Sequence, residues 1–359
     1  MNNTKTVFVG LSGGVDSSVA ALRLKNEGYN VVGVFIKVWH PDFLECNWEA
    51  ERLDAMRVAA KLHVPFLTCD AEEVYRNDVA DYFIHEYELG RTPNPDVMCN
   101  KYVKFGAFLH FAKKHGADYV ATGHYAQNIY RSGKFELHRG VDTNKDQSYF
   151  LWTLTQEQLS KVLLPVGNST KNVIRKEADE MGLITAAKKD SQGICFLGQI
   201  DIPEFLSHYI ALEEGDVLNE NGEVIGTHKG ALVYTKGQRH GFSVTNTATH
   251  SAPHYAVSRN IKANTITVSN VKQREIAATE ITLSDCNYIA YVPEINDTIA
   301  FQSRYRQKVS TGIVQGSGAQ TLQIQTSHET EGLSEGQSCV LYRGSQCLGG
   351  GIIAGCRLP

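Results

Sequence analysis

Up to about residue 200, short apolar runs of strand length alternate with segments of helical periodicity. The runs at 6–10, 31–37, 65–69 and 119–122 predict strands, and the segments at 17–27, 51–62, 71–89 and 104–115 predict helices. Such alternation favours a parallel sheet with helices on both faces. The predicted strands are rich in Val, Phe and Ile, which is typical of strands buried on both sides. We therefore expect a doubly wound α/β domain.

After about residue 205 the helical periodicity fades, and short runs rich in Val, Ile, Thr and Tyr alternate with turn signals. Asn221-Gly222, followed by an apolar run, is a hairpin signature. Further strands are predicted at 264–268, 298–301, 322–326, 338–342 and 349–353. Closely spaced strands of this kind favour a small β-barrel or sandwich. The region at 206–275 is expected to form a small unit of its own.

Composition excludes several classes of protein. Hydrophobic residues make up 42% of the 359 residues, and no apolar run approaches the ~18–20 residues that span a bilayer. The first residues do not resemble a signal peptide. A net charge of −4 argues against a protein that coats DNA nonspecifically, but not against a selective nucleic-acid enzyme. No two of the eight cysteines stand within four positions, so zinc ribbons and CxxC redox motifs are disfavoured. We expect a cytoplasmic protein with reduced thiols.

A glycine- and serine-rich loop, Ser12-Gly-Gly-Val-Asp-Ser-Ser18, joins the first predicted strand to the first predicted helix. Gly13 and Gly14 allow positive φ and a close approach of the backbone to a ligand. The amides of the following helix N-terminus favour an anion such as phosphate. Neither the Walker pattern nor the dinucleotide fingerprint fits these residues. The alternative is a tight turn that binds nothing.

Two cysteines far apart in sequence are candidates for chemistry. Cys99 follows Asp96 in a segment that Pro93 and Pro95 are expected to stiffen into a loop, so a base and a nucleophile stand together. Cys195 lies downstream of Lys188-Lys189, and nearby positive charge would lower its pKa and favour the thiolate. The alternatives are an incidental cysteine in a Pro-rich connector and a buried structural cysteine.

Taken together, these segments resemble known enzymes. The loop at 12–18 resembles the pyrophosphatase loop of the ATP-pyrophosphatase superfamily, which cleaves ATP between the α- and β-phosphates. With the segments at 121–126, 145–150, 230–237 and 347–353, the chain resembles tRNA-specific 2-thiouridylases over essentially its whole length. The resemblance implies a Rossmann-like nucleotide-binding and catalytic domain at 1–205, a small central tRNA-binding domain at 206–275 and a C-terminal β-barrel at 276–359.

The resemblance also implies three groups of site residues and the ligands ATP, Mg²⁺ and tRNA. Asp16 would help to position the metal, whose other ligands the sequence does not identify. The catalytic residues would be Cys99, Cys195 and Asp96. The ATP contacts would be Gly10, Leu11, Ser12, Gly13, Gly14, Val15, Asp16, Ser17, Ile36 and Gly123. The tRNA contacts would be Asn94, Pro95, Asp96, His124, Lys145, Asp146, Gln147, Arg304, Tyr305 and Gln337.

The implied reaction converts the wobble uridine of tRNA to 2-thiouridine. Adenylation turns the C2 oxygen into a good leaving group, and Cys195 would carry a persulfide delivered by a sulfur-relay donor protein. Cys99 would release the sulfur, either by closing a disulfide with Cys195 or by liberating sulfide, and Asp96 would act as general acid and base. We expect a monomer that acts without a membrane.

Two other functions are compatible with parts of the sequence. One is an ATP-pyrophosphatase synthetase that acts on a small molecule and needs neither cysteine. The other is a nucleotide-sensing RNA-binding protein without turnover. The segment at 37–48 departs from the commoner family pattern, and Cys46 within it has no role that we can assign.

Overall fold

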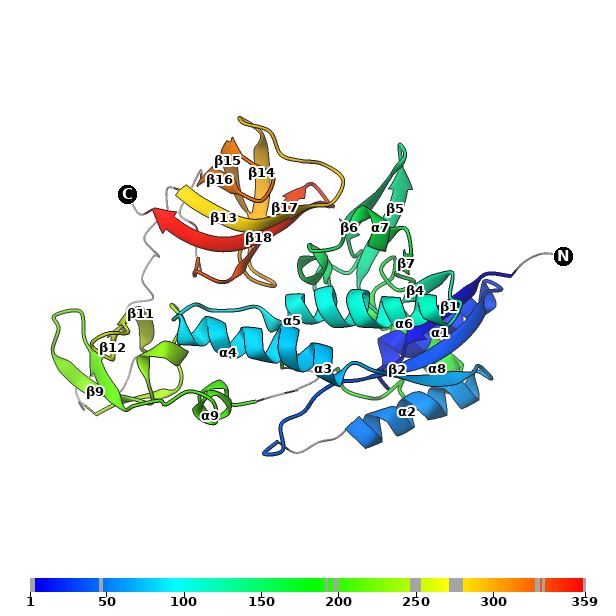
Figure 1. Cartoon of the computed structure of the whole chain (residues 1–359), viewed down its shortest axis with the longest axis horizontal. Helices are drawn as coiled ribbons and strands as arrows, with labels where there is room; N and C mark the ends of the chain where they lie inside the picture. The colour runs from blue at the N-terminus through cyan, green and yellow to red at the C-terminus, as the bar shows by residue number, and fades with distance from the viewer. Residues whose placement is uncertain are drawn as a thin grey trace.

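The computed structural model describes residues 4–44, 48–190, 193–195, 198, 200–245, 253–270, 280–326, 330 and 333–357, so Cys46 lies outside the described residues. Its first unit contains a five-stranded parallel sheet in the order β3-β2-β1-β4-β7 (Figure 1). The strands are β1 Thr6–Gly10, β2 Asn30–Lys37, β3 Phe66–Asp70, β4 Tyr119–Ala121 and β7 Val162–Leu163. The strand order reverses beside β1, so the carboxyl ends of β1 and β4 form a topological switch point, where ligands bind in sheets of this kind.

Alternate side chains of the strands enter two separate cores, one on each face of the sheet, which confirms the predicted doubly wound arrangement. Val7 and Val9 pack on one face against α1 Val15–Asn26, α2 Trp48–Lys61 and α8 Lys171–Glu180. Phe8 packs on the other face against a second set of helices. That set comprises α3 Glu72–Tyr75, η1 Arg76–Ala80, α5 Pro95–Met98, η2 Cys99–Ala107 and α6 Phe108–Lys114.

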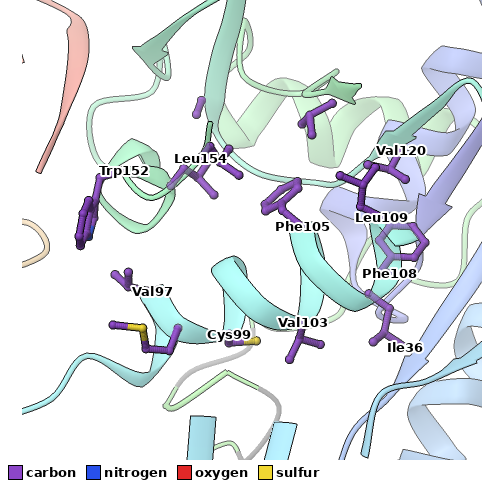
Figure 2. Close-up of a cluster of buried hydrophobic side chains, with 14 of the residues drawn as sticks. Ile36, Val97, Cys99, Val103, Phe105, Phe108, Leu109, Val120, Trp152 and Leu154 are labelled. Atoms are coloured by element: carbon purple, nitrogen blue, oxygen red, sulfur yellow. The ribbon is translucent and has the colours of Figure 1, made fainter. Parts of the chain in front are cut away.

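Figure 2 shows part of the second core, with Val97, Cys99, Val103, Phe105 and Phe108 along one continuous helix. The sequence predicted this helix only from residue 104 and placed Asp96 and Cys99 on a loop, which is wrong. Asn94 accepts a hydrogen bond from the Val97 amide at 3.3 Å, and Pro95 occupies the first helical position, where its fixed φ favours a helix. The loop therefore ends at residue 94.

Both long helices of this face contain π-helical turns that α-helical periodicity does not predict. The predicted helix at 71–89 consists of α3, η1 and α4 Asp81–Glu88, while η2 winds as a π-helix between α5 and α6. Helix α4 points toward the small unit (Figure 1), where Phe83 and Tyr87 share a core with Phe205 and Val233. This apolar contact joins the first two units.

The small unit is a five-stranded sheet in the order β10-β9-β8-β12-β11. The predicted hairpin at Asn221-Gly222 is confirmed, because Gly222 has a φ of +84° between antiparallel β8 and β9. The elements are α9 Ile202–Ser207, β8 Gly215–Leu218, β9 Val224–His228, η4 Ala231–Val233, β10 Phe242–Val244, β11 Tyr255–Asn260 and β12 Thr265–Ser269.

The C-terminal strands form a closed barrel of six strands, in the order β13-β16-β15-β14-β17-β18, because β13 also pairs with β18. Its strands are β13 Glu280–Tyr288, β14 Thr298–Gln302, β15 Ser310–Ser317, β16 Leu322–Thr326, β17 Ser338–Arg343 and β18 Gln346–Arg357. Figure 1 shows the barrel as a separate body, in yellow, orange and red, next to α4 and α5. Of the two alternatives that the strand pattern left open, the barrel is therefore confirmed.

A hairpin that the sequence did not predict, β5 Ala126–Arg131 and β6 Lys134–Arg139, ties the first unit to the barrel. Strand β6 pairs with β18, with Leu137 opposite Cys347. The remaining elements are η3 Ser148–Leu151 and α7 Gln156–Leu159. None of the helices in the described part of the chain has the length and apolar character needed to cross a membrane.

Candidate functional site

The two candidate cysteines, 96 positions apart in the chain, meet in the structure. The Cys99 thiol donates a hydrogen bond to Sγ of Cys195 at 3.4 Å. Cys99 projects from η2 and is fully buried (Figure 2), while Cys195 is partly exposed. Both thiols are free. A disulfide bond is ~2.05 Å long, so a closing movement of roughly 1.4 Å would join the two sulfurs.

The segment that carries Cys195 is held by two side chains of the helical layer. Oδ1 of Asp96 accepts a hydrogen bond from the Cys195 amide at 2.7 Å, and the Tyr75 hydroxyl donates to the Cys195 carbonyl at 2.9 Å. Burial raises the pKa of Asp96 above its usual range, against the effect of this amide and of the Lys104 charge. A carboxyl group with a raised pKa can hold and release a proton, as a general acid and base must.

The positive charge beside the thiols comes from Lys104, which the sequence analysis missed. Its ammonium group lies close enough to both thiols for its charge to lower their pKa values. The hydrogen bond from Cys99 lowers the pKa of Cys195, and the charge of Lys104 lowers it further against burial, whereas burial raises the pKa of Cys99. Cys195 is therefore the thiol that ionises first.

Lys188, which was expected to supply this charge, makes a salt bridge with Asp54 on α2 instead. The ammonium lies 2.8 Å from the Asp54 carboxylate. The expected direction of the effect on Cys195 holds, but Lys104 and not Lys188 is the cation that the structure identifies for it. Proximity in sequence misled here, because Lys188 lies against α2 whereas Cys195 lies against Cys99 of η2.

The predicted ATP contacts gather at the switch point between β1 and β4. Gly13 has a φ of +69°, and a Cβ there would lie 2.8 Å from the Glu51 carbonyl oxygen. Gly123, just after β4, approaches so closely that a Cβ would lie 2.6 Å from the Ser17 amide nitrogen. A Cβ on Gly10 would likewise touch Ile36, at 3.7 Å. Only glycine fits at residues 13 and 123. Without side chains at these two positions, a bound anion could approach the backbone amides that begin α1.

Some of the other residues of this loop belong to the hydrophobic core, and others supply hydrogen-bond donors. Leu11 and Val15 are buried, so only their backbone can face a ligand. The hydroxyls of Ser12 and Ser17 lie 3.3 Å apart at the head of α1. This arrangement of helix amides and hydroxyls suits a phosphate group.

Asp16, the candidate metal-positioning residue, takes part in a charged network. Lys171 bonds both of its carboxylate oxygens at 2.7 and 2.8 Å, and the Tyr125 hydroxyl donates to it at 2.6 Å. Lys171 also contacts Asp190 at 2.8 Å, so the network connects the loop with the segment that leads to Cys195. Over the described ranges, no three His, Cys, Asp or Glu side chains gather to hold a metal ion.

The loop at 90–94, which precedes the candidate catalytic residues, is held by both other units. Gln337 of the barrel donates to the carbonyls of Thr92 and Pro93 at 3.1 and 3.0 Å. Arg259 of the small unit donates to the Gly90 carbonyl. Asn94, a predicted tRNA contact, is buried and caps the following helix. Gln337 thus supports the loop from the barrel.

Several other predicted tRNA contacts have partners inside the protein. Asp146 is buried and accepts hydrogen bonds from Arg139 and from the Gly140 amide. His124 is also buried and lies 2.7 Å from the Thr122 hydroxyl. Burial, together with the charge of Lys104, lowers the pKa of His124 well below its usual value. Both side chains are therefore bonded inside the protein in this structure.

Five other predicted tRNA contacts are partly exposed: Pro95, Lys145, Gln147, Arg304 and Tyr305. Lys145 makes a salt bridge with Asp190 at 2.5 Å, and the Gln147 side chain accepts a hydrogen bond from the Tyr125 amide. Arg304 donates to the Lys236 carbonyl at 3.0 Å, and Tyr305 packs against Phe150. Pro95 opens helix α5 beside Asp96.

Comparison with known proteins places three family models end to end on the chain. The tRNA methyl transferase HUP domain matches residues 5–199, the tRNA methyl transferase PRC-barrel domain matches 203–270, and the aminomethyltransferase beta-barrel domain matches 278–353. These models correspond in order to the parallel-sheet unit, the small unit and the closed barrel.

Curated relatives match over nearly the whole chain. The tRNA-specific 2-thiouridylase MnmA of Geobacillus thermodenitrificans is 42% identical over 351 residues, covering 97% of this chain and 94% of that protein. The enzyme of the same name from Bacillus mycoides is 43% identical with the same coverage. Among solved structures, the U34-tRNA thiolase NcsA from Methanococcus maripaludis matches 58% of this chain and 64% of that chain at 15% identity. Its TM-score of 0.35 is too low to support a conclusion.

Proposed function

Since this chain belongs to the family of tRNA-specific 2-thiouridylases, we propose that it uses ATP to replace the C2 oxygen of the wobble uridine of tRNA by sulfur. It is a tRNA sulfurtransferase, and the synthetase alternative is not favoured, because relatives that are 42–43% identical and match 97% of the chain are thiouridylases. The observation that supports this site for the chemistry is the pair of thiols 3.4 Å apart beside Asp96.

In the first step, the glycine-rich loop would bind the triphosphate of ATP through the amides that begin α1. The uridine C2 oxygen attacks the α-phosphate, and pyrophosphate leaves. Gly13 and Gly123 keep the space beside the loop free of side chains. Mg²⁺ commonly binds one or two carboxylates together with substrate phosphates, so the single carboxylate of Asp16 fits it when the salt bridge to Lys171 opens. Bound there, the ion would neutralise charge on the leaving pyrophosphate.

In the second step, a persulfide on Cys195 would deliver sulfur. Its outer sulfur attacks C2, AMP leaves with the original oxygen, and the nucleoside is joined to Cys195 through a disulfide. The Cys99 thiolate then attacks Sγ of Cys195, so that a Cys99–Cys195 disulfide forms and the electron pair of the broken bond leaves with 2-thiouridine. A dithiol reductant must afterwards reduce the enzyme.

The other route reverses the order of these events. Cys99 attacks the persulfide first, closing the same disulfide and releasing sulfide, which then attacks C2. In both routes Cys99 must lose a proton although burial raises its pKa. Asp96, three residues earlier on the same helix, would accept that proton.

The family also suggests a persulfide donor protein as sulfur source and contacts from both smaller units to tRNA. We propose domain boundaries near residues 205 and 275, and a cytoplasmic monomer, because the proposed catalytic side chains come from one chain and both substrates occur in the cytoplasm. Lys145, Arg304 and Tyr305 are partly exposed, as residues that contact phosphate or stack on bases must be.

Nucleoside mass spectrometry tests the proposal on unmodified tRNA incubated with Mg-ATP and a persulfide donor. Wild-type protein should yield 2-thiouridine, whereas Cys99→Ser and Cys195→Ser should not. Cys356→Ser, a partly exposed cysteine of the barrel, is the matched control and should retain activity. Adding free sulfide to Cys195→Ser separates the routes, because only the sulfide route allows rescue. Cleavage of ATP without any sulfur in the tRNA would refute the proposed acceptor.

A further inference from the structure

Lys104 lies five residues after Cys99 in η2, its side chain is partly buried, and Cys99 itself contacts Sγ of Cys195 at 3.4 Å. In an α-helix, side chains five residues apart point about 140° away from each other around the axis. The wider i→i+5 winding of a π-helix takes more than four residues per turn, so it brings side chains five residues apart to nearly the same face. The π-helical winding of η2 therefore places the ammonium group on the side of the helix that faces the thiols.

The groups around this ammonium favour its charged form. Burial alone would lower the pKa of Lys104, but the nearby Cys195, Cys99 and Asp96 outweigh burial and raise it. His124 is kept neutral by burial and by Lys104 itself. Tyr75, the remaining titratable group at the pair, has a pKa raised well above its usual value by burial and stays protonated. Among the described residues, the cation beside the thiols is consequently Lys104, and Cys195 is the thiol whose pKa is lowered there.

We propose that Lys104 is the positioning residue that keeps Cys195 as a thiolate and orients its sulfur. A thiolate, and not a thiol, is the nucleophile in sulfur transfer. The Cys195 thiolate would attack the outer sulfur of a donor persulfide, so that a new sulfur–sulfur bond forms on Cys195 while the donor leaves as a thiolate. This use of the thiolate depends on the proposed function, whereas the charge state of Cys195 belongs to the free protein.

Alkylation of the reduced full-length protein by iodoacetamide tests the charge state without tRNA or ATP. The rate at Cys195 is followed by peptide mass spectrometry between about pH 5.5 and 9.5. An opposite charge within a few ångströms shifts a pKa by about 1–3 units, so Lys104→Met should slow alkylation at pH 7 by about tenfold or more. Lys104→Arg should restore the wild-type profile. Lys101→Met removes an exposed lysine of the same helix and should change nothing.

An unchanged pH profile in Lys104→Met would overturn the proposal, even if the variant were less stable, because a merely structural role does not move the profile. Circular dichroism verifies folding, and if Lys104→Met does not fold, Lys104→Gln provides the same comparison. Nucleoside mass spectrometry on the same variants separates this inference from the proposed function. If wild-type protein makes no 2-thiouridine, the proposed function is refuted. If the alkylation profile of Lys104→Met is nevertheless shifted from that of wild type, the role of Lys104 stands.

Discussion

Asp190 joins three cations near the proposed nucleotide site, and Asp190→Asn would remove the charge that pairs with them. The carboxylate lies 2.5 Å from Lys145, 2.8 Å from Lys171 and 2.7 Å from Arg175. The substitution keeps the shape of the side chain but leaves the three positive groups without their shared counter-ion. We expect the free energy of unfolding to fall.

The pKa of Asp190 gives the size of the effect. Burial alone would raise this pKa, but the hydrogen bonds from Lys145 and Lys171 outweigh burial and lower it from 3.8 to about 2. A difference of roughly 1.8 pKa units, at about 1.36 kcal/mol each, corresponds to an upper limit of about 2.4 kcal/mol. The side chain is 28% exposed, so water screens part of this interaction. We expect Asp190→Asn to cost about 1–2 kcal/mol at pH 7.

The sign of the pH dependence follows from the lowered pKa. The stabilisation by Asp190 is fully present above the pKa of the unfolded chain, near 3.8, and is lost as the pH falls toward about 2. The difference between wild type and Asp190→Asn should therefore stay constant from about pH 5 to pH 8. It should shrink only below about pH 4.

Urea unfolding followed by tryptophan fluorescence measures this difference, because Trp39, Trp48 and Trp152 all lie in the first unit. The matched control is Glu180→Gln on α8, whose partner Lys176 lies 3.6 Å away with both side chains largely exposed. Exposed pairs contribute little, so the control should stay within about 0.5 kcal/mol of wild type. The reasoning is refuted if Asp190→Asn also stays within about 0.5 kcal/mol of wild type, or if Glu180→Gln loses as much stability as Asp190→Asn.

Gly123→Ala would place a Cβ 2.6 Å from the Ser17 amide nitrogen, so calorimetry should show ATP binding weakened at least tenfold. The control is Gly355→Ala, where a Cβ meets nothing within 4 Å, and this variant should bind ATP as wild type does. Arg259→Met removes the hydrogen bond to the Gly90 carbonyl in the loop at 90–94. The rate of tRNA thiolation should fall several-fold while ATP affinity stays unchanged. An equal loss in thiolation rate and in ATP affinity would contradict a role of Arg259 in holding this loop. Burial raises the pKa of Cys69 to about 11, so Cys69 should resist iodoacetamide at pH 8 in the native protein and react in urea. Fast native labelling would show that this thiol is accessible.

The strands and the first loop were predictable because their signals are local. Val7, Phe8 and Val9 are apolar on both faces, and Gly13 stands where the turn requires positive φ. The start of helix α5 at Pro95 was missed because two prolines in a short segment favour a loop. In the structure, the Asn94 side chain caps the helix and Pro95 occupies its first position.

The charged neighbourhood of the thiols could not be predicted from sequence distance. Lys104 was missed because five-residue spacing puts it on the wrong face of an ordinary α-helix, and nothing local in the sequence announces a π-helix. Asp146 and His124 belong to segments typical of the family, but only the fold reveals that their side chains are buried against internal partners.

The loop at 90–94 is held by hydrogen bonds to its main chain. Gln337 donates to two of its carbonyls and Arg259 to a third, and the Thr92 amide donates to the Glu335 carbonyl. These hydrogen bonds reach main-chain atoms, so on the side of the loop they do not depend on the Thr92 or Pro93 side chain. On the other side they depend on the side chains of Arg259 and Gln337. A fragment that ended near residue 205 would carry every proposed catalytic group and yet lack these hydrogen bonds, so the two smaller units also serve to fix the loop that leads into the catalytic helix.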